Sequence, residues 1–340
     1  MKNNNTSDIL AILTKNAFGD NEHPFALYFN YNSTGGMFFR GFSGDRLGGI
    51  GDIINENTRF RLASVTKQFI ARAVVELEHS GKLSFNDKLG KFFPDFPDVY
   101  AGIPLSMLLN HTSGIPDYED MPDDGSGRQV IDSDVPEYLK TLGYTYFTPG
   151  SRYRYSNTCF VLLGIIIEKA SGMPLTDAMK KLVFAPAKLG KTLVDVEGET
   201  IIPDRAYGHI EKDGRIIQKD QYRWSATIGD GGIYSCIDDL IKWIDNMLEN
   251  NDRLSENMLR DAILPDGTPI GYGMGIRLKN IDGRRIICHT GATIGFNSAL
   301  MYSPDMDLKL CFLTNREMNE PFDIINNALS FVFGRDQKFF

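Results

Sequence analysis

Alternation of hydrophobic and polar positions near the start of the chain gives way to helical spacing after residue 64. Residues 25–31 and 37–42 are rich in Phe and Tyr, and the segment between them contains Asn, Ser and two glycines. This pattern predicts an antiparallel hairpin, with a short helix before it. Beyond the hairpin, apolar residues recur at the spacing of one helix face at Phe69, Ile70, Ala73, Val74 and Leu77. Gly81 predicts the end of that helix.

The middle third continues with helical patterns, and the last third changes to strands. We predict helices over residues 135–142, 156–170, 175–184, 238–248 and 322–333. We predict strands over residues 272–278, 285–289, 298–302 and 309–313. Strand patterns from both ends of the chain therefore bracket a helical middle.

This order predicts an α+β fold, in which terminal helices flank an antiparallel sheet and a mostly helical part is inserted in the centre. We expect residues 1–63 and 200–340 to form the sheet-containing α/β subdomain. Residues 64–199 are expected to form the mostly helical subdomain.

Composition limits the classes of protein that remain. Of 340 residues, 42% are hydrophobic and 24% are charged, which is typical of a folded globular chain and not of a disordered one. The formal net charge of −8 offers no basic field for phosphates, so we expect no nucleic-acid partner.

No segment has the length of a membrane span. The longest apolar run, residues 160–167, is far shorter than the roughly 20 residues required, so no transmembrane segment is expected. The apolar run over residues 9–13 is too short for a secretory leader. The sequence as written predicts a cytoplasmic protein, and an extracellular or cell-surface one if a leader has been removed.

Cysteines and histidines give no sign of a metal or redox centre. Cys159, Cys236, Cys288 and Cys311 form no C-x-x-C pair, which predicts reduced core thiols. The five histidines lack metal-ligand spacing, and no P-loop, H-E-x-x-H or complete G-x-G-x-x-G occurs. We expect no metal and no cofactor. A G-x-S-x-G elbow is also absent, which excludes the serine site of α/β-hydrolases.

Ser64 and Lys67 form an S-x-x-K pair at the start of the first strong helical pattern. A three-residue step on a helix brings Cβ atoms to about 5–6 Å on one face, so the amine can reach the hydroxyl. A serine at a helix start also lies where free backbone N–H groups favour developing negative charge. Ser64 is a candidate nucleophile, and the alternative interpretation is a helix N-cap.

Two further motifs strengthen the interpretation of Ser64 as a nucleophile. Tyr155 and Asn157 introduce the next strongly apolar helix, where a tyrosine hydroxyl near a lysine can act as a general base. The alternative is that the tyrosine simply packs. His289-Thr290-Gly291-Ala292 follows a strand-like run and could pair with an extended substrate through its backbone and hold a carboxylate.

In this order and at these separations, the three motifs resemble those of the serine penicillin-recognising enzymes. This family contains class C β-lactamases, DD-peptidases, D-aminopeptidases and related esterases. The stretches at residues 108–116, 148–150, 229–235 and 272–275 are similar to the family as well. The resemblance implies two subdomains with the active site in the cleft between them.

The resemblance also implies roles for individual residues. Ser64 would be the acylated nucleophile, and Lys67 and Tyr155 the proton-transfer pair. Asn157 would bind Lys67 and the substrate amide. His289 and Thr290 would contact a substrate carboxylate, with Gly291 in the same motif. The N–H groups of Ser64 and Ala292 would form the oxyanion hole.

One departure from the pattern bears on the substrate. Most β-lactamases have K-T-G where this chain has His289-Thr290-Gly291, and a histidine is cationic only below its pKa, ordinarily about 6.5. H-T-G is more typical of DD-peptidases and D-amino-acid peptidases. No E-x-x-L-N supplies a class A deacylating glutamate.

These observations predict a serine hydrolase that forms a covalent acyl-serine on D-amino-acid-containing peptides, as a DD-carboxypeptidase does, with β-lactam acylation as a side reaction. A carboxylesterase or class C-like β-lactamase is the alternative on the same fold. A catalytically silent relative that binds peptidoglycan or a protein is the alternative from another class. The expected partner is a small molecule or peptide with a D-amino-acid, β-lactam or ester group. The sequence does not fix the oligomeric state.

Overall fold

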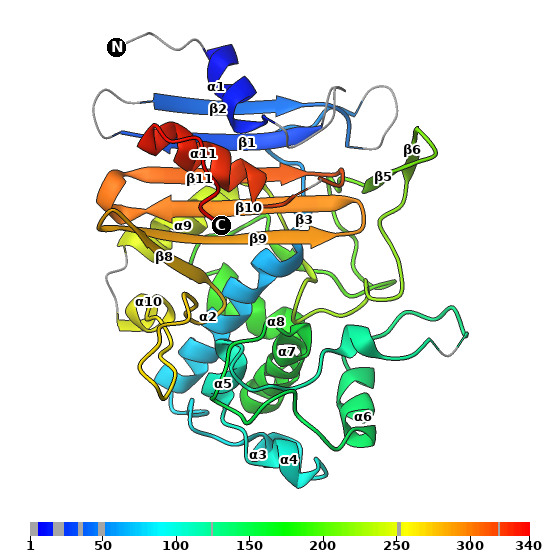
Figure 1. Cartoon of the computed structure of the whole chain (residues 1–340). Helices are drawn as coiled ribbons and strands as arrows, with labels where there is room; N and C mark the ends of the chain where they lie inside the picture. Colours follow the sequence, from blue (N-terminus) through cyan, green and yellow to red (C-terminus); the bar gives the residue numbers. More distant parts are fainter. Residues whose placement is uncertain are drawn as a thin grey trace.

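A six-stranded antiparallel sheet forms one end of the molecule in the computed structural model (Figure 1). The structure describes residues 6–15, 24–32, 37–46, 52–123, 125–249, 253–318 and 320–340. In spatial order the strands are β2 (Met37–Ser43), β1 (Phe25–Tyr31), β11 (Leu308–Thr314), β10 (Phe296–Ser303), β9 (Arg284–Thr293) and β8 (Arg277–Ile281). The sheet thus joins the first strands of the chain to the last.

The pairing of the strands places the most apolar ones in the middle of the sheet. The predicted hairpin is confirmed as β1 and β2, whose turn at residues 33–36 lies outside the described residues. Strand β1 also pairs with β11, with Tyr28 opposite Cys311. Strands β10 and β11 are buried along nearly their whole length, because helices cover both faces of the sheet here.

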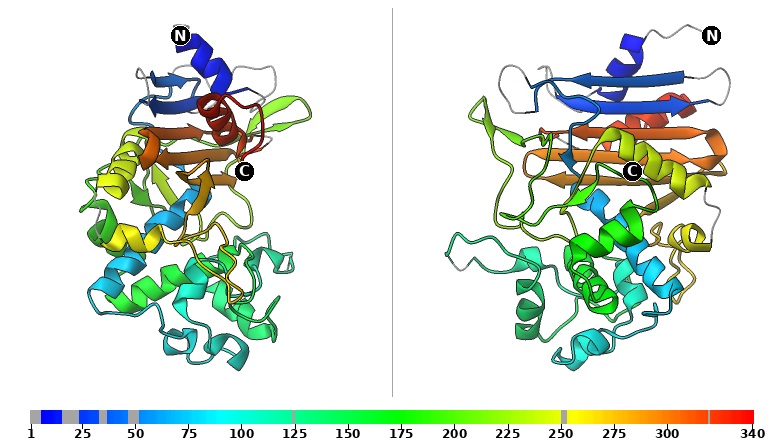
Figure 2. Two further views of the ribbon diagram at one scale, coloured as in Figure 1. Left: turned by 60° about the vertical axis from the view of Figure 1, so that its left-hand side comes forward. Right: turned by 180° about the vertical axis from the view of Figure 1, so that it is seen from behind.

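Helices from both ends of the chain cover one face of the sheet. Helix α1 (Thr6–Leu13) packs against α11 (Asp323–Phe333), and Figure 2 shows both on that face. Helix α9 (Ile237–Glu249) lies on the opposite face and contacts β11. The predicted helices over residues 238–248 and 322–333 are thereby confirmed.

The remaining helices gather below the sheet (Figure 1). At the centre, α2 (Thr66–His79) packs against α7 (Asn157–Ser171), which ends at Gly172 with φ 72°. The other members are α3 (Leu89–Phe92), α4 (Asp98–Ala101), α5 (Leu105–Leu109), α6 (Asp134–Thr141), α8 (Leu175–Met179), the π-helical turn Lys180–Phe184 and α10 (Arg253–Met258). One apolar core runs from these helices to the sheet.

Two smaller sheets are formed by short strands. Strand β7 (Ile233–Ser235) lies between β3 (Phe60–Arg61) and β4 (Leu193–Val194). Strands β5 (His209–Lys212) and β6 (Arg215–Gln218) form a hairpin that projects from the molecule in Figure 1. The sequence patterns did not predict these short strands.

The strand predicted over residues 272–278 is wrong over residues 272–276, because β8 begins only at Arg277. Gly271 and Gly275 have φ of 70° and 71°, so the chain turns sharply here. A Cβ on Gly275 would lie within 3.0 Å of the Lys67 backbone. The glycines therefore serve a tight loop against α2.

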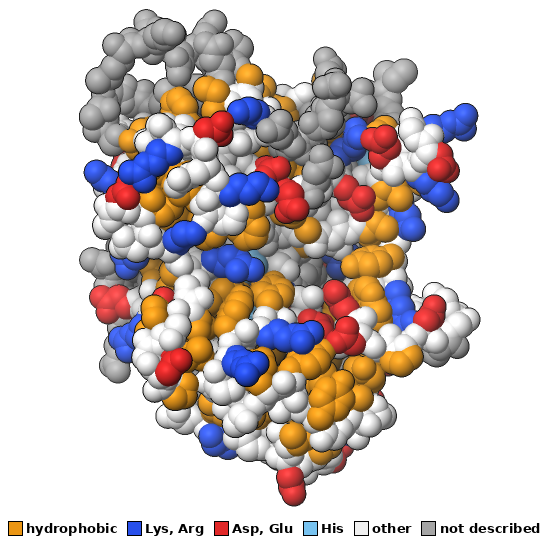
Figure 3. All heavy atoms as spheres, in the orientation of Figure 1, with side chains coloured by type: hydrophobic (Ala, Val, Ile, Leu, Met, Phe, Trp, Pro, Cys, Tyr) orange, Lys and Arg blue, Asp and Glu red, His pale blue; other side chains and the backbone are white. Residues whose placement is uncertain are grey.

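The α+β fold with terminal helices on an antiparallel sheet is confirmed. The division into residues 1–63 plus 200–340 and residues 64–199 stays a prediction. In the described part of the chain no single helix could cross a membrane, although α7 and the segment Leu175–Phe184, bent by 82°, pass the length and composition test as a pair. On the face drawn in Figure 3, basic and acidic side chains are interspersed.

Candidate active site

Ser64 lies in a single 3₁₀ turn, Ala63–Val65, that leads directly into α2. The turn follows β3 and contacts β9, so it stands between the sheet and the helices. Ala63 has φ 46°, in the left-handed region that residues with a Cβ rarely adopt. Such backbone strain is maintained only where the surroundings enforce it, which is common at functional sites.

Lys67 is fully buried and is held by three hydrogen bonds. Its Nζ donates to Ser64 Oγ at 3.0 Å, to Asn157 Oδ1 at 2.8 Å and to the Asp230 carbonyl at 2.9 Å. The last two partners can only accept. The hydroxyl of Ser64 can accept from an ammonium or donate to a neutral amine, so this geometry suits both protonation states of Lys67.

Asn157 is the first residue of α7, and each of its polar groups is engaged. Its backbone N–H donates to Asp117 Oδ2 at 2.8 Å, which satisfies one free donor of the helix start. Its side-chain Nδ2 donates to Glu119 Oε1 at 3.1 Å. The orientation of the amide, with its oxygen toward Lys67, is therefore fixed from both sides.

Tyr155 borders the same cluster. Lys67 Nζ lies 4.9 Å from the centre of the Tyr155 ring. The His111 ring packs against the Tyr155 ring, with 4.3 Å between their centres. The Tyr155 hydroxyl is buried and has no hydrogen-bond partner among the described residues. It is thus a buried donor and acceptor that a reacting group can engage.

Strand β9 passes directly against the turn that carries Ser64. An added Cβ on Gly291 would lie 3.1 Å from the Ser64 nitrogen, so the two backbones are nearly in contact. Thr290 is 9% exposed, and Ala292 is exposed. The structure therefore brings the residues predicted for the oxyanion hole to one place.

His289 is turned away from solvent. The ring is 2% exposed; Nε2 is 2.9 Å from the Tyr272 hydroxyl and Nδ1 is 2.7 Å from the Thr290 carbonyl. Burial, with Arg277 and Lys67 nearby, lowers the pKa of His289 well below its ordinary value. The ring is turned inward and both of its nitrogens have partners, and the expected contact with a substrate carboxylate stays a prediction.

A small pocket of about 40 Å³ opens beside the nucleophile. Ser64, Asn157 and Ala292 line it together with Tyr118, Glu119, Tyr222, Trp224 and Thr293. Loss of solvent around Glu119, with Asp117 and Asp230 nearby, raises the pKa of Glu119 to about 7. The pocket therefore holds a carboxyl that changes charge near neutrality.

Sequence reasoning missed several contributors. The Asp230 carbonyl carries no side-chain signal, although residues 229–235 were among the family-like stretches. Glu119 lies in an acidic run without a metal-binding pattern. His111 also lies in a family-like stretch, and its burial beneath Tyr155 depends on tertiary packing.

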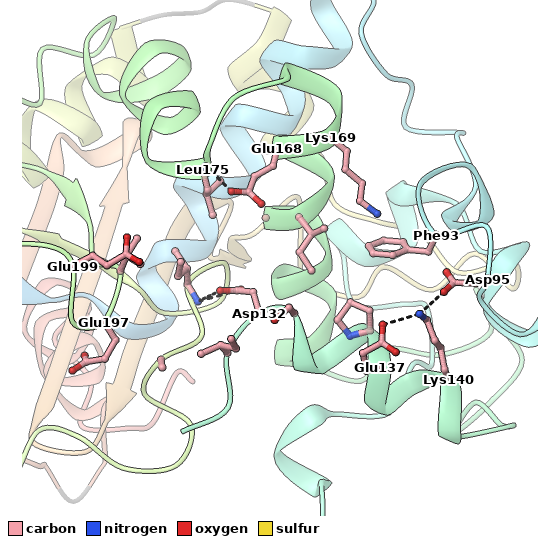
Figure 4. Close-up of a pocket in the computed structure, with 18 residues that line it drawn as sticks. Phe93, Asp95, Asp132, Glu137, Lys140, Glu168, Lys169, Leu175, Glu197 and Glu199 are labelled. Atoms are coloured by element: carbon pink, nitrogen blue, oxygen red, sulfur yellow. Dashed lines mark hydrogen bonds and ion pairs between the residues drawn. The ribbon is translucent and has the colours of Figure 1, made fainter. Parts of the chain in front are cut away.

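A second, larger pocket of about 690 Å³ lies between α6, α7 and the segment 196–199 (Figure 4). Asp132 faces it and accepts hydrogen bonds from the N–H groups of Ile228 and Gly229. These residues precede Asp230, whose carbonyl binds Lys67. Asp132 thus supports the active site from behind.

No group of three or more His, Cys, Asp or Glu that could hold a metal occurs in the described ranges.

A turn serine bonded to a buried lysine, with an asparagine and strand β9 beside them, is the arrangement of a serine hydrolase of the beta-lactamase type. The chain belongs to the beta-lactamase family, because the family model described as Beta-lactamase matches residues 35–333.

Curated relatives agree with this assignment. Penicillin-binding protein 4* of Bacillus subtilis is 32% identical over 312 residues, covering 83% of this chain and 66% of that protein. A D-aminopeptidase of Brucella anthropi is 28% identical over 286 residues, covering 80% of this chain and 53% of that protein. The chain thus spans about two thirds of the first relative's length and half of the second's.

Solved structures share the fold over nearly the whole chain. A penicillin-binding protein from Bacillus halodurans has a TM-score of 0.79 at 24% identity, covering 98% of this chain and 100% of that one. The D-amino acid amidase of Ochrobactrum anthropi, complexed with L-phenylalanine amide, has a TM-score of 0.75 at 22% identity, covering 96% and 99%.

Proposed function

We propose that this protein hydrolyses amide bonds of D-amino-acid-containing peptides or amides through an acyl-serine intermediate. The observation that carries the proposal is the hydrogen-bonded set of Ser64, Lys67 and Asn157 beside the edge of β9. The relatives named above as D-aminopeptidase and penicillin-binding protein support the substrate class.

In the acylation step, Ser64 Oγ attacks the substrate carbonyl while its proton passes to Lys67 Nζ, with the unpartnered Tyr155 hydroxyl beside it. The C–N bond then breaks, and the departing amine takes up one proton. The N–H groups of Ser64 and Ala292 stabilise the oxyanion that forms in between.

In the deacylation step, water adds to the acyl carbon and gives one proton back through Lys67 or Tyr155 to Ser64 Oγ. The products are the free carboxylic acid and the restored serine. No further co-reactant is required, because water supplies both the OH of the acid and the proton that returns to Ser64 Oγ.

Pocket size and charge specify the substrate further. The pocket beside Ser64 is small, about 40 Å³, which favours a compact group such as the methyl of alanine. Glu119 in its ionised form would attract a substrate α-ammonium. With His289 buried, these features favour a D-alanyl amide or peptide with a free amine over a substrate recognised by its carboxylate.

Mass spectrometry of the intact protein tests the acyl-serine. We expect wild type to gain the mass of one benzylpenicillin, and Ser64→Ala to gain none. Ser171→Ala, which removes a hydroxyl at the far end of α7, serves as the matched control and should acylate like wild type. Release of p-nitroaniline from D-alanine p-nitroanilide should depend on Ser64 in the same way.

Three results would contradict the proposal. Acylation of Ser64→Ala would show another nucleophile. Turnover of p-nitrophenyl butyrate with no turnover of D-alanine p-nitroanilide would replace the amidase with an esterase. Absence of both acylation and turnover in a folded wild type would indicate a silent binding protein.

A further inference from the structure

A continuous chain of hydrogen bonds joins the start of α7 to strand β9 behind the active site. The Ser156 N–H donates to His111 Nδ1 at 3.2 Å, and His111 Nε2 lies 3.3 Å from the Tyr272 hydroxyl. The same hydroxyl lies 2.9 Å from His289 Nε2, and His289 Nδ1 lies 2.7 Å from the Thr290 carbonyl. We call His111, Tyr272 and His289 the His–Tyr–His bridge.

The two ends of the bridge fix the direction of every bond in it. A backbone N–H only donates, so His111 Nδ1 is the acceptor and the proton of that ring is on Nε2. A carbonyl only accepts, so the proton of His289 is on Nδ1 and its Nε2 accepts. The Tyr272 hydroxyl between them accepts from one histidine and donates to the other. The two rings are thus opposite tautomers.

The surroundings hold both rings in the neutral form. His111 and Tyr272 are 0% exposed and His289 is 2% exposed, so water does not reach the bridge. Lys67 and Arg277 are the basic side chains near it, and Tyr153 and Tyr155 border it. Burial, followed by these charges, lowers the pKa of both histidines well below the ordinary value. An added proton on His289 Nε2 would also leave the Tyr272 hydroxyl between two donors, and one on His111 Nδ1 would face the Ser156 N–H.

The bridge ends on groups that the reaction uses. His111 packs on the ring of Tyr155 at 4.3 Å between centres. At the other end, N–H and C=O groups of residues i and i+2 lie on the same edge of a strand. The Thr290 carbonyl that His289 binds therefore shares an edge of β9 with the Ala292 N–H.

We propose that the His–Tyr–His bridge is a positioning device, which sets Tyr155 and the Ala292 N–H in register across the cleft through two neutral histidines of opposite tautomer. It exchanges no proton with substrate during turnover. The positioning role rests on the proposed function, whereas the tautomer assignment follows from hydrogen-bond geometry alone.

Long-range proton–nitrogen NMR of the wild-type chain tests the tautomers at neutral pH, with signals assigned by His111→Asn and His289→Asn. We expect His111 protonated on Nε2 and His289 protonated on Nδ1. An imidazolium at either position, or the same tautomer at both, would overturn the proposal. This measurement needs no turnover, so it stands even if the proposed function fails.

Tyr272→Phe tests the positioning role, because it removes the central hydroxyl and keeps the ring. We expect kcat for D-alanine p-nitroanilide to fall by about 10-fold to 100-fold, as misplacement of reacting groups does, with KM changed much less. The rate of acylation by benzylpenicillin should fall in parallel. The two NMR signals should lose their fixed tautomers.

Tyr302→Phe is the matched control. Tyr302 is also fully buried, its hydroxyl has no hydrogen-bond partner among the described residues, and it lies in β10 opposite Ile287, two residues along from His289. We expect wild-type kcat from it. A folded Tyr272→Phe variant with wild-type kcat would refute the positioning role, and equal losses in both variants would reduce the effect to general packing.

Discussion

Gly291 passes so close to Leu62 that an added Cβ would lie within 3.0 Å of the Leu62 carbonyl oxygen. The same atom would press on Ser298 Oγ, which itself donates to that carbonyl at 2.7 Å. Strand β9 can therefore lie this close to the turn that carries the candidate nucleophile only because residue 291 has no side chain.

Gly291→Ala should consequently separate β9 from Ser64. We expect a loss of about 1–3 kcal/mol in the free energy of unfolding, as for other overpacked sites, and a fall in kcat of about 100-fold. Chemical denaturation and D-alanine p-nitroanilide hydrolysis measure the two effects. Gly143→Ala is the control, because a Cβ there meets nothing within 4 Å. A Gly291→Ala enzyme as active as the control would refute the close contact.

Glu119→Gln should weaken binding of substrates with a free α-amine. The substitution keeps an acceptor for Asn157 Nδ2 but removes the negative charge, and we expect KM for D-alanine p-nitroanilide to rise by about 10-fold, the value of one charge-assisted hydrogen bond. The pKa of Glu119 is raised to about 7, so the wild-type KM should fall as pH rises through 7.

The variant should lose that pH dependence. Measurements between pH 6 and 7.5 keep most of the α-ammonium charged, because its pKa is about 7.7–8.0. An N-acetylated substrate provides the second comparison and should show the same KM with both enzymes. Equal KM values for the free-amine substrate would remove Glu119 from substrate recognition.

Asp132→Asn should stabilise the protein at alkaline pH. Burial, with Asp230 nearby, raises the pKa of Asp132 from 3.8 to about 7, so between these values the folded state binds more protons than the unfolded state. Its contribution to stability is therefore lost as pH rises through this window. At pH 8 the variant should gain on the order of 2 kcal/mol and still accept from Ile228 and Gly229.

Thermal unfolding at pH 5 and pH 8 measures this difference. Asp266→Asn is a suitable comparison, because hydrogen bonds from Thr268 lower the pKa of that exposed carboxyl. Its removal should not raise stability at pH 8. An Asp132→Asn curve parallel to that of wild type would contradict the assignment of a proton to Asp132.

The cysteines should be unreactive in the native protein. All four are buried and free, which confirms the predicted core thiols, and burial raises the pKa of Cys159 to about 11 and of Cys288 to about 12. The thiolate is the reactive form, so Ellman's reagent should label four thiols only after denaturation. Stoichiometric labelling of folded protein would show that a thiol opens to solvent.

Periodicity in the sequence predicted the long elements well. The helices near residues 64–81 and 156–170 and the hairpin at the start of the chain lie where apolar spacing placed them. The prediction failed where close packing between backbone segments, and not the spacing of apolar residues, determines the local structure. Residues 272–276 look like a strand, yet Gly275 must pass against the Lys67 backbone and the chain turns there instead.

For the site, sequence reasoning identified the side chains but not their surroundings. Ser64, Lys67 and Asn157 meet as the motifs predicted. The inward position of the His289 ring includes a contact with Tyr272, and no local pattern reveals which hydroxyl will approach a ring nitrogen. The same holds for the Asp230 carbonyl, because every residue offers one and only the fold selects it.

The pairing of β1 with β11 has a consequence for biogenesis. The hairpin β1–β2 leaves the ribosome well before its partner strand β11, because the whole helical middle of the chain lies between them. Until then one edge of β1 has no partner, and such an edge invites pairing with other chains. Closing the sheet late brings together contacts of high sequence separation, which slows folding. Yield of the protein should therefore depend on whatever shields that hairpin during translation.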